Sequence, residues 1–134
     1  MNDFTTKDMA DLLYGILSEI KDNEKDKTNV VLQTPTTESK YPCRMINTPL
    51  ESVVKTERAV PVQKIFQVSI EHWDEALESS MEMVNKTEEA LRRKNFIRTM
   101  TSPIVLDEKI KKYKLTTTYE VRYNTITNSL EFIR

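Results

Sequence analysis

The chain has 134 residues, a length typical of a single domain, with 38% hydrophobic residues, 31% charged residues and a net charge of −1. Gly15 is its one glycine, whereas average usage of about 7% would give roughly nine. Because phosphate-binding loops need several glycines, a P-loop, a dinucleotide fingerprint and a nucleophile elbow are excluded. Cys43 is the one cysteine, which excludes an internal disulfide and a cysteine-based zinc site and favours a reducing compartment.

The first predicted element is a helix that starts at a capping box of Thr5 and Asp8 and ends near Lys21. Gly15 lies off its apolar stripe and costs the helix about 1 kcal/mol relative to alanine. The stripe recurs at helical spacing and consists of Met9, Leu12, Leu13, Ile16, Leu17 and Ile20. The sequence therefore predicts an amphipathic N-terminal helix.

The next part of the chain, 21–40, is charged and polar, and we expect a flexible segment with one short strand at 30–33. The segment CRMI then begins an extended stretch that ESVVK continues. Because Pro42 and Pro49 bracket CRMI, we expect an edge strand or a bend there. A turn is expected in TERAVP, residues 56–61.

A half-buried strand is predicted next, because Phe66, Val68 and Ile70 alternate with polar residues. The alternation places His72 on the Ile70 face and Trp73 on the Glu71 face.

A second helix should follow, with Asp74 as its cap and Glu75 in its first turn. Its apolar stripe should contain Leu77, Met81, Val84 and Leu91, widened by Ala76, Met83 and Ala90. Trp73 should pack onto Leu77, and the helix should end in Arg-Arg-Lys at 92–94.

The C-terminal part is predicted to contain a strand-like segment interrupted by Pro103, an alternating strand at 115–124 and a closing strand in LEFI, 130–133. Because helices do not separate the strands singly, the expected fold is α+β. We expect one domain, 1–134, with a mostly antiparallel sheet and an N-terminal and a central amphipathic helix on one face.

Two residues are candidates for chemistry. His72 is the only histidine, and with Glu71 or Asp74 it would suit a small hydrolase, but a strand end followed by a capped helix explains the same residues. Cys43 would be a nucleophile if the adjacent Arg44 lowered the pKa of its thiol. Neighbouring residues of a strand point to opposite faces, however, which argues against this effect. We assign no catalytic, cofactor-binding or metal-binding residue.

The charges are unevenly distributed. Residues 1–90 contain 10 Lys+Arg and 17 Asp+Glu, giving −7, and residues 91–134 contain 10 and 4, giving +6. Eight of these ten basic residues form a basic region between 92 and 114, namely Arg92, Arg93, Lys94, Arg98, Lys109, Lys111, Lys112 and Lys114. They indicate either nucleic-acid contact or pairing of the basic part with the acidic part, within one chain or between copies. The pI near 5.9 argues against nucleic acid.

The chain resembles the tail terminator, or tail completion, proteins of tailed bacteriophages and phage-tail-like particles. The resemblance rests on the N-terminal helix, YPCRMINTPLESVV, FQVSIEHWDE opening onto the second helix, and TTTYEVRYN with its closing strand. It departs from the family in the charged segment 21–40. The resemblance implies a hexameric ring that caps the last ring of the tail tube, stops its growth and provides a docking surface for the neck. It implies no cofactor and no reaction.

The partners implied are further copies of the chain, the tail tube protein, a neck or head-completion protein and, if the tail is contractile, a sheath protein. DNA would pass through the ring without specific contact, and no membrane is involved. The expected location is the virion, after synthesis in the bacterial host cytoplasm. Alternatives are another neck or tube component, a nucleic-acid-binding module and a small hydrolase.

The contact segments we expect are the polar loops 34–40 and 55–61 and the basic stretch 107–114. The expected interface residues are Lys55, Glu57 and Arg58, together with Lys109, Lys111 and Lys112. If the −7 and +6 halves pair between copies, reversing the charges of Lys109, Lys111 and Lys112 should weaken the ring.

Overall fold

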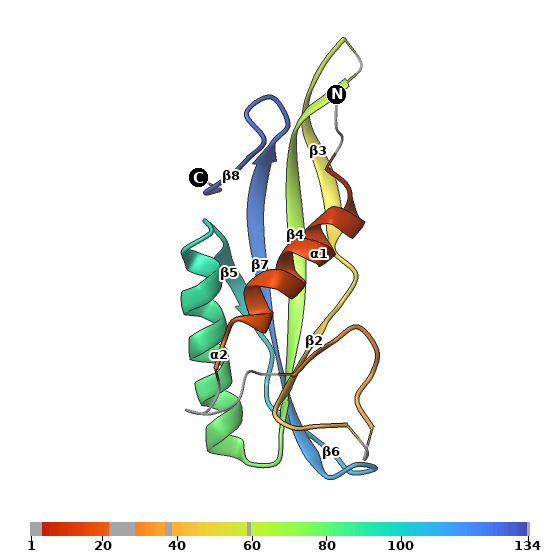
Figure 1. The fold of residues 1–134 in the computed structure, drawn as a ribbon, viewed down its shortest axis with the longest axis vertical. Helices are drawn as coiled ribbons and strands as arrows, with labels where there is room; N and C mark the ends of the chain where they lie inside the picture. Colours follow the sequence, from red (N-terminus) through yellow and green to blue (C-terminus); the bar gives the residue numbers. More distant parts are fainter. Residues whose placement is uncertain (1–3, 22–28, 37–38, 59, 134) are drawn as a thin grey trace.

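Two long antiparallel strands, β4 (Val60–Asp74) and β7 (Lys112–Asn124), form the spine of the sheet and run along the long axis of the molecule (Figure 1). Their pairing extends from Gln63 opposite Asn124 to Asp74 opposite Tyr113. The structure, a computed structural model, describes residues 4–21, 29–36, 39–58 and 60–133. Residues 22–28 and 37–38 of the predicted flexible segment lie outside the described residues, as does position 59 of the predicted turn.

Shorter strands flank this spine on both sides. β2 (Cys43–Ile46) and β3 (Leu50–Glu57) pair with opposite halves of β4, and β1 (Asn29–Val31) lies parallel to β2. Along the other side, β6 (Val105–Asp107), β5 (Ile97–Thr101) and β8 (Ser129–Glu131) follow one another on β7. The described residues thus form a mostly antiparallel eight-stranded sheet with two helices, which confirms the predicted α+β class.

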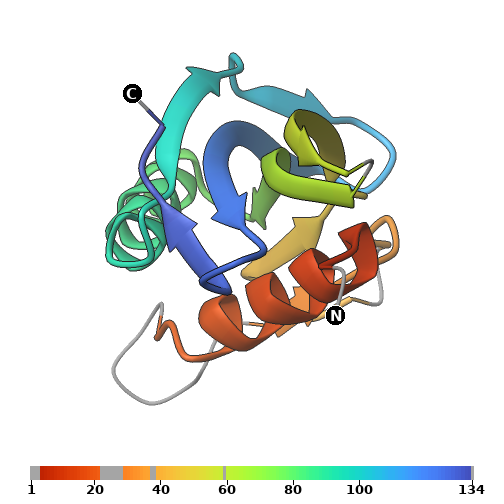
Figure 2. The same cartoon turned by 90° about the horizontal axis from the view of Figure 1, so that it is seen from above.

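One face of the spine carries the core. The period-two pattern places Phe66, Val68 and Ile70 of β4 beside Tyr119 and Val121 of β7, and all five side chains are fully buried. Both helices pack on this face, and Figure 2 shows them next to each other against the curled sheet. The alternation predicted for both strands is confirmed.

Helix α1 (Thr6–Ser18) begins at the predicted capping box. The Thr5 N–H donates to Asp8 Oδ2 at 2.8 Å, and the Asp8 N–H donates back to Thr5 Oγ1 at 3.2 Å. Met9, Leu13 and Leu17 are fully buried, as the stripe predicts. The helix ends three residues before the predicted Lys21, because the N–H groups of Glu19 and Ile20 close it by donating to the carbonyls of Ile16 and Leu17, respectively.

Helix α2 (Leu77–Arg92) differs from its prediction in its start and in part of its buried face. Ala76 is the N-cap, without a side-chain hydrogen bond, whereas Asp74 ends β4 and accepts from the Glu75 N–H at 2.7 Å. Leu77 and Met81 are 46% and 53% exposed. The buried residues of the helix are Ser80, Met83, Val84, Thr87 and Leu91.

The strands before β4 correct two further expectations. Of the two alternatives for this stretch, the edge strand is wrong, because β2 lies between β1 and β4, whereas the chain does bend at 41–42. Residues 47–49 then interrupt the strand before β3 begins. The turn expected over 56–61 is tighter, because β3 continues to Glu57 and β4 begins at Val60. Arg58 stands in this turn with a φ of 51°.

Candidate functional site

His72 lies in a buried polar cluster with Arg44 and Thr87, and all three residues are 0% exposed. β2 and β4 set Arg44 and His72 directly opposite each other, and α2 places Thr87 above them. Arg44 Nε donates to Thr87 Oγ1 at 2.6 Å, and Arg44 Nη2 donates to the Met83 carbonyl at 2.9 Å. The two imidazole nitrogens lie 2.9 Å from the Leu115 carbonyl and 2.9 Å from Thr87 Oγ1.

The contact with the Leu115 carbonyl decides which ring nitrogen of His72 carries a proton. A carbonyl oxygen only accepts, so Nδ1 carries the proton and donates to Leu115. Nε2 lies 2.9 Å from Thr87 Oγ1, and the Thr87 hydroxyl donates to the Met83 carbonyl at 2.9 Å while its oxygen accepts from Arg44 Nε. These hydrogen bonds join Arg44, Thr87, His72 and the Leu115 carbonyl into one buried network, which holds α2 on the sheet.

The acidic residues near His72 in the sequence, Glu71 and Asp74, form hydrogen bonds with other groups. Glu71 points to the other face of β4 and accepts from Trp73 Nε1 at 3.0 Å, and the Asp74 carboxylate bonds the Glu75 N–H. With both ring nitrogens engaged and no exposed surface, His72 is a structural residue of the core margin. No group of three or more His, Cys, Asp and Glu side chains within the described residues could hold a metal.

Trp73 lies on the face that the alternation predicts, with Glu71, but it does not belong to the helix-side core cluster. Lys114 Nζ lies 5.6 Å from its ring centroid, and Trp73 is 3% exposed. The predicted partner, Leu77, is largely exposed on α2. Trp73 therefore stabilises the face of the sheet that does not carry the helices.

Cys43 is fully buried at the start of β2, opposite Trp73. Burial, helped by the negative charge of Asp74, raises the pKa of its thiol to about 12, although Arg44 acts in the opposite direction. The thiolate required of a nucleophile is therefore scarce at neutral pH.

The six predicted interface residues fall at two opposite ends of the molecule (Figure 1). Lys55, Glu57 and Arg58 lie at the turn between β3 and β4, here called the hairpin end, where Lys55 and Glu57 form an exposed ion pair at 3.8 Å. Lys109, Lys111 and Lys112 lie at the turn between β6 and β7, here called the basic end. Of the third predicted segment, 34–40, residues 37–38 lie outside the described part of the chain.

The turn at the basic end has a defined shape. Asp107 Oδ1 accepts from the Lys109 and Ile110 N–H groups at 3.0 and 3.4 Å, and the Lys111 N–H donates to the Asp107 carbonyl at 2.7 Å. Lys112 pairs with Glu75 at 3.4 Å and lies 5.1 Å from the Tyr41 ring centroid. Within the described residues, the side chains of Lys109 and Lys111 make no ion pair or hydrogen bond and project into solvent.

Much of the remaining basic region pairs with acidic residues of the same chain. Arg92 and Arg98 both contact Glu88, at 2.9 and 3.2 Å. Arg93 contacts Glu89 at 2.6 Å. The alternative of pairing within one chain therefore accounts for these three arginines, which makes a continuous phosphate-binding surface on α2 less favourable.

The exposed apolar edges of the sheet were not predicted from the sequence. All eight residues of β3 are exposed, and Leu50, Val53 and Val54 are 63%, 51% and 47% exposed. On the opposite edge, all five residues of β5 are exposed, including Ile97 and Met100 at 38% and 59%. Adjacent residues of a regular strand point to opposite faces. The adjacent valines Val53 and Val54 therefore indicated that at least one apolar side chain lies outside the core. Here the ladder skips Val54, between the pairs of Val53 and Lys55 with β4, so this residue is a bulge.

Comparison of the chain with protein-family models gives no match, and comparison with curated proteins gives no significant match. Neither helix in the described residues has the length and apolar character needed to cross a bilayer.

Proposed function

We propose that this protein is a structural, ring-forming tail terminator of a tailed bacteriophage or phage-tail-like particle. It would cap the last ring of the tail tube, stop tube growth and offer a docking surface to the neck. The observation that carries the proposal is the pair of sheet edges, β3 and β5, on opposite sides of the spine, whose outer sides pair with no further strand of the described residues. A closed ring needs two unlike patches of this kind, because each copy meets its neighbour head to tail.

Strand direction supports this assembly. β3 is antiparallel to β4, β4 to β7 and β7 to β5, so β3 and β5 run in opposite directions. When copies stand side by side in the same orientation, β3 of one copy meets β5 of the next as an antiparallel pair. Backbone hydrogen bonds would join the sheets, and the exposed side chains of Val53 and Met100 would lose water contact.

The two ends of the molecule would then have separate tasks. If the ring axis follows the strands, the hairpin end and the basic end lie on opposite faces of the ring. One would contact the tail tube and the other the neck. Because Lys109 and Lys111 lie at an end and not at a sheet edge, their charge reversal should impair docking more than ring closure.

The proposal is tested by the mass of the purified protein in solution, measured by light scattering over concentration and salt, with negative-stain images of the same sample. We expect closed hexameric rings. Long tubes would favour a tube protein, and a monomer over the whole range would contradict edge-to-edge assembly.

Lysine substitution at an edge provides the matched comparison. Val53→Lys places a charge where a neighbouring strand would pair and should dissociate the rings, because lysine on an edge opposes strand addition. Met81→Lys introduces the same charge at a residue of nearly equal exposure, 53% against 51%, on helix α2. Rings that survive Val53→Lys, or that are lost equally in Met81→Lys, would refute the role of β3.

A further inference from the structure

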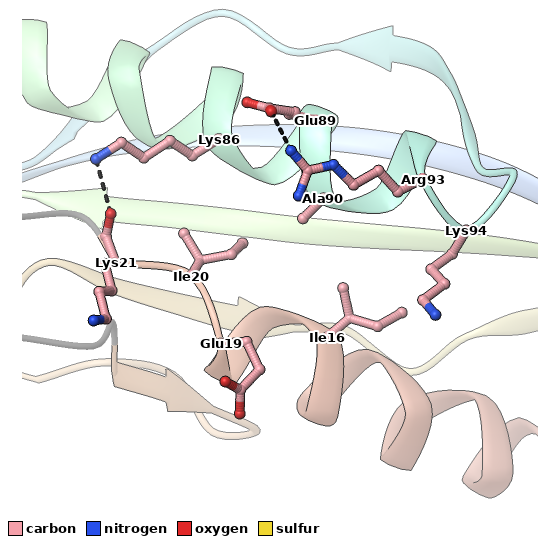
Figure 3. Close-up of a pocket in the computed structure, with 9 residues that line it drawn as sticks. All are labelled: Ile16, Glu19, Ile20, Lys21, Lys86, Glu89, Ala90, Arg93 and Lys94. Atoms are coloured by element: carbon pink, nitrogen blue, oxygen red, sulfur yellow. Dashed lines mark hydrogen bonds and ion pairs between the residues drawn. The ribbon is translucent and has the colours of Figure 1, made fainter.

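A groove of about 410 Å³ lies between the C-terminal parts of α1 and α2 (Figure 3). Its apolar lining comes from Ile16 and Ile20 on the α1 side and Ala90 on α2. Ile20 belongs to the main core cluster, and Ile16 and Ala90 pack against it, so the floor of the groove is continuous with the core. The groove therefore offers an apolar surface whose residues are held in place by the core.

The rim of the groove is predominantly cationic. Four cations, Lys21, Lys86, Arg93 and Lys94, line it against two carboxylates, Glu19 and Glu89. Glu89 is already paired with Arg93 at 2.6 Å. Figure 3 shows Lys94 extending toward Ile16, and its ammonium makes no ion pair or hydrogen bond among the described residues.

We propose that this groove binds an acidic amphipathic segment of a partner protein. Apolar side chains of the segment would cover Ile16, Ile20 and Ala90, and its carboxylates would meet Lys94 and the neighbouring cations. A nucleic acid fits less well, because the lining contains no aromatic ring on which bases could stack.

This site is independent of the proposed ring. All of its lining residues belong to one chain, and they lie on the two helices and the residues that follow each of them, so none of them belongs to the edge strands β3 and β5. A monomer would bind the segment as well as a ring does, so failure of one proposal does not imply failure of the other.

The test uses a fluorescein-labelled synthetic helical peptide with leucines along one face and glutamates along the other, and fluorescence anisotropy measures its binding to the full chain. The control peptide has lysine in place of every glutamate. We expect the glutamate peptide to bind at least roughly tenfold more tightly than the lysine peptide. Equal binding of the two peptides would overturn the charge selection.

Two variants locate the site. Lys94→Glu should weaken binding of the glutamate peptide roughly tenfold, whereas Lys111→Glu, the same charge change at the basic end, should leave it unchanged. Ala90→Leu should fill the groove and weaken binding, while the melting temperature stays nearly the same because leucine is almost as good a helix former as alanine.

Circular dichroism of each variant controls for folding. If Lys94→Glu and Ala90→Leu bind the peptide as the original chain does, the groove is not the site. An equal loss in Lys111→Glu and Lys94→Glu would overturn the proposal in favour of general charge attraction.

Discussion

β3 and β4 are consecutive strands of one hairpin, but their apolar residues have opposite environments. In β4, Phe66, Val68 and Ile70 are fully buried under the helices. In β3, Leu50 and Val53 are at least half exposed. The difference arises because β4 has a paired strand on both sides and belongs to the helix-covered spine, whereas β3 pairs on one side only. Apolar content therefore shows that a segment can form a strand, but the position in the sheet decides whether it serves folding or association.

The largest expected effect of a single substitution on the free energy of unfolding is in the buried strand, β4. Phe66→Ala removes a fully buried ring that packs edge-on against Phe4, at 5.6 Å between centroids. It should lower the free energy of unfolding by about 3–5 kcal/mol in urea denaturation. Val53→Ala in the exposed strand should change it by less than about 0.5 kcal/mol. Similar losses in the two variants would show that β3 contributes to the monomer core.

Hydroxyl groups should show the same difference between buried and exposed positions. Thr87→Val keeps the shape of a buried side chain but removes the hydroxyl that bonds Arg44 and His72. We expect a loss of about 1–3 kcal/mol, because buried polar groups lose their partner.

Thr127→Val is its exposed counterpart, because Thr127 bonds Ser129 at the surface at 2.6 Å. It should stay within about 0.5 kcal/mol of the original chain in the same urea titration. A neutral Thr87→Val would mean that the buried cluster is not coupled to stability.

The smallest expected effect appears only in alkali. Burial raises the pKa of Cys43 from 9.0 to about 12 and that of Tyr119 from 10.0 to about 12. A group whose pKa is raised by folding binds its proton more tightly in the folded state, so its contribution is complete below pH 9.0 and declines as the pH rises toward 12.

Cys43→Ala should therefore lose less stability than the original chain between pH 9.0 and 10.0, the interval in which Cys43 ionises before Tyr119 in the unfolded chain. Urea titrations across this interval provide the measurement. Parallel pH profiles for the two proteins would contradict the buried, protonated thiol.

The sequence predicted the elements with a regular apolar period and failed where hydroxyl groups occupy a buried face. Ser80 and Thr87 are buried on α2 because their hydroxyls donate to the Ala76 and Met83 carbonyls, each at 2.9 Å. The helix satisfies these polar groups by itself, so they pack like small apolar residues. A pattern that counts apolar residues assigns the stripe to Leu77 and Met81 instead.

The candidate site was predictable only as separate segments. The turns that contain Arg58 and Lys111 are recognisably polar in the sequence, but their separation to opposite ends follows from the order of strands in the sheet. That order depends on long-range pairing, which local spacing does not specify. The free edges β3 and β5 could not be predicted for the same reason.

The pairing of β4 with β7 has a consequence for the timing of folding. Asp74 and Tyr113 are 39 positions apart in the chain, and Gln63 and Asn124 are 61 apart. During synthesis on the ribosome, β4 therefore lacks its main pairing strand until α2 and β7 have been made. During that interval the β3–β4 hairpin exposes both its apolar edge and its future core face, so this nascent segment is where chaperone binding or premature aggregation should begin.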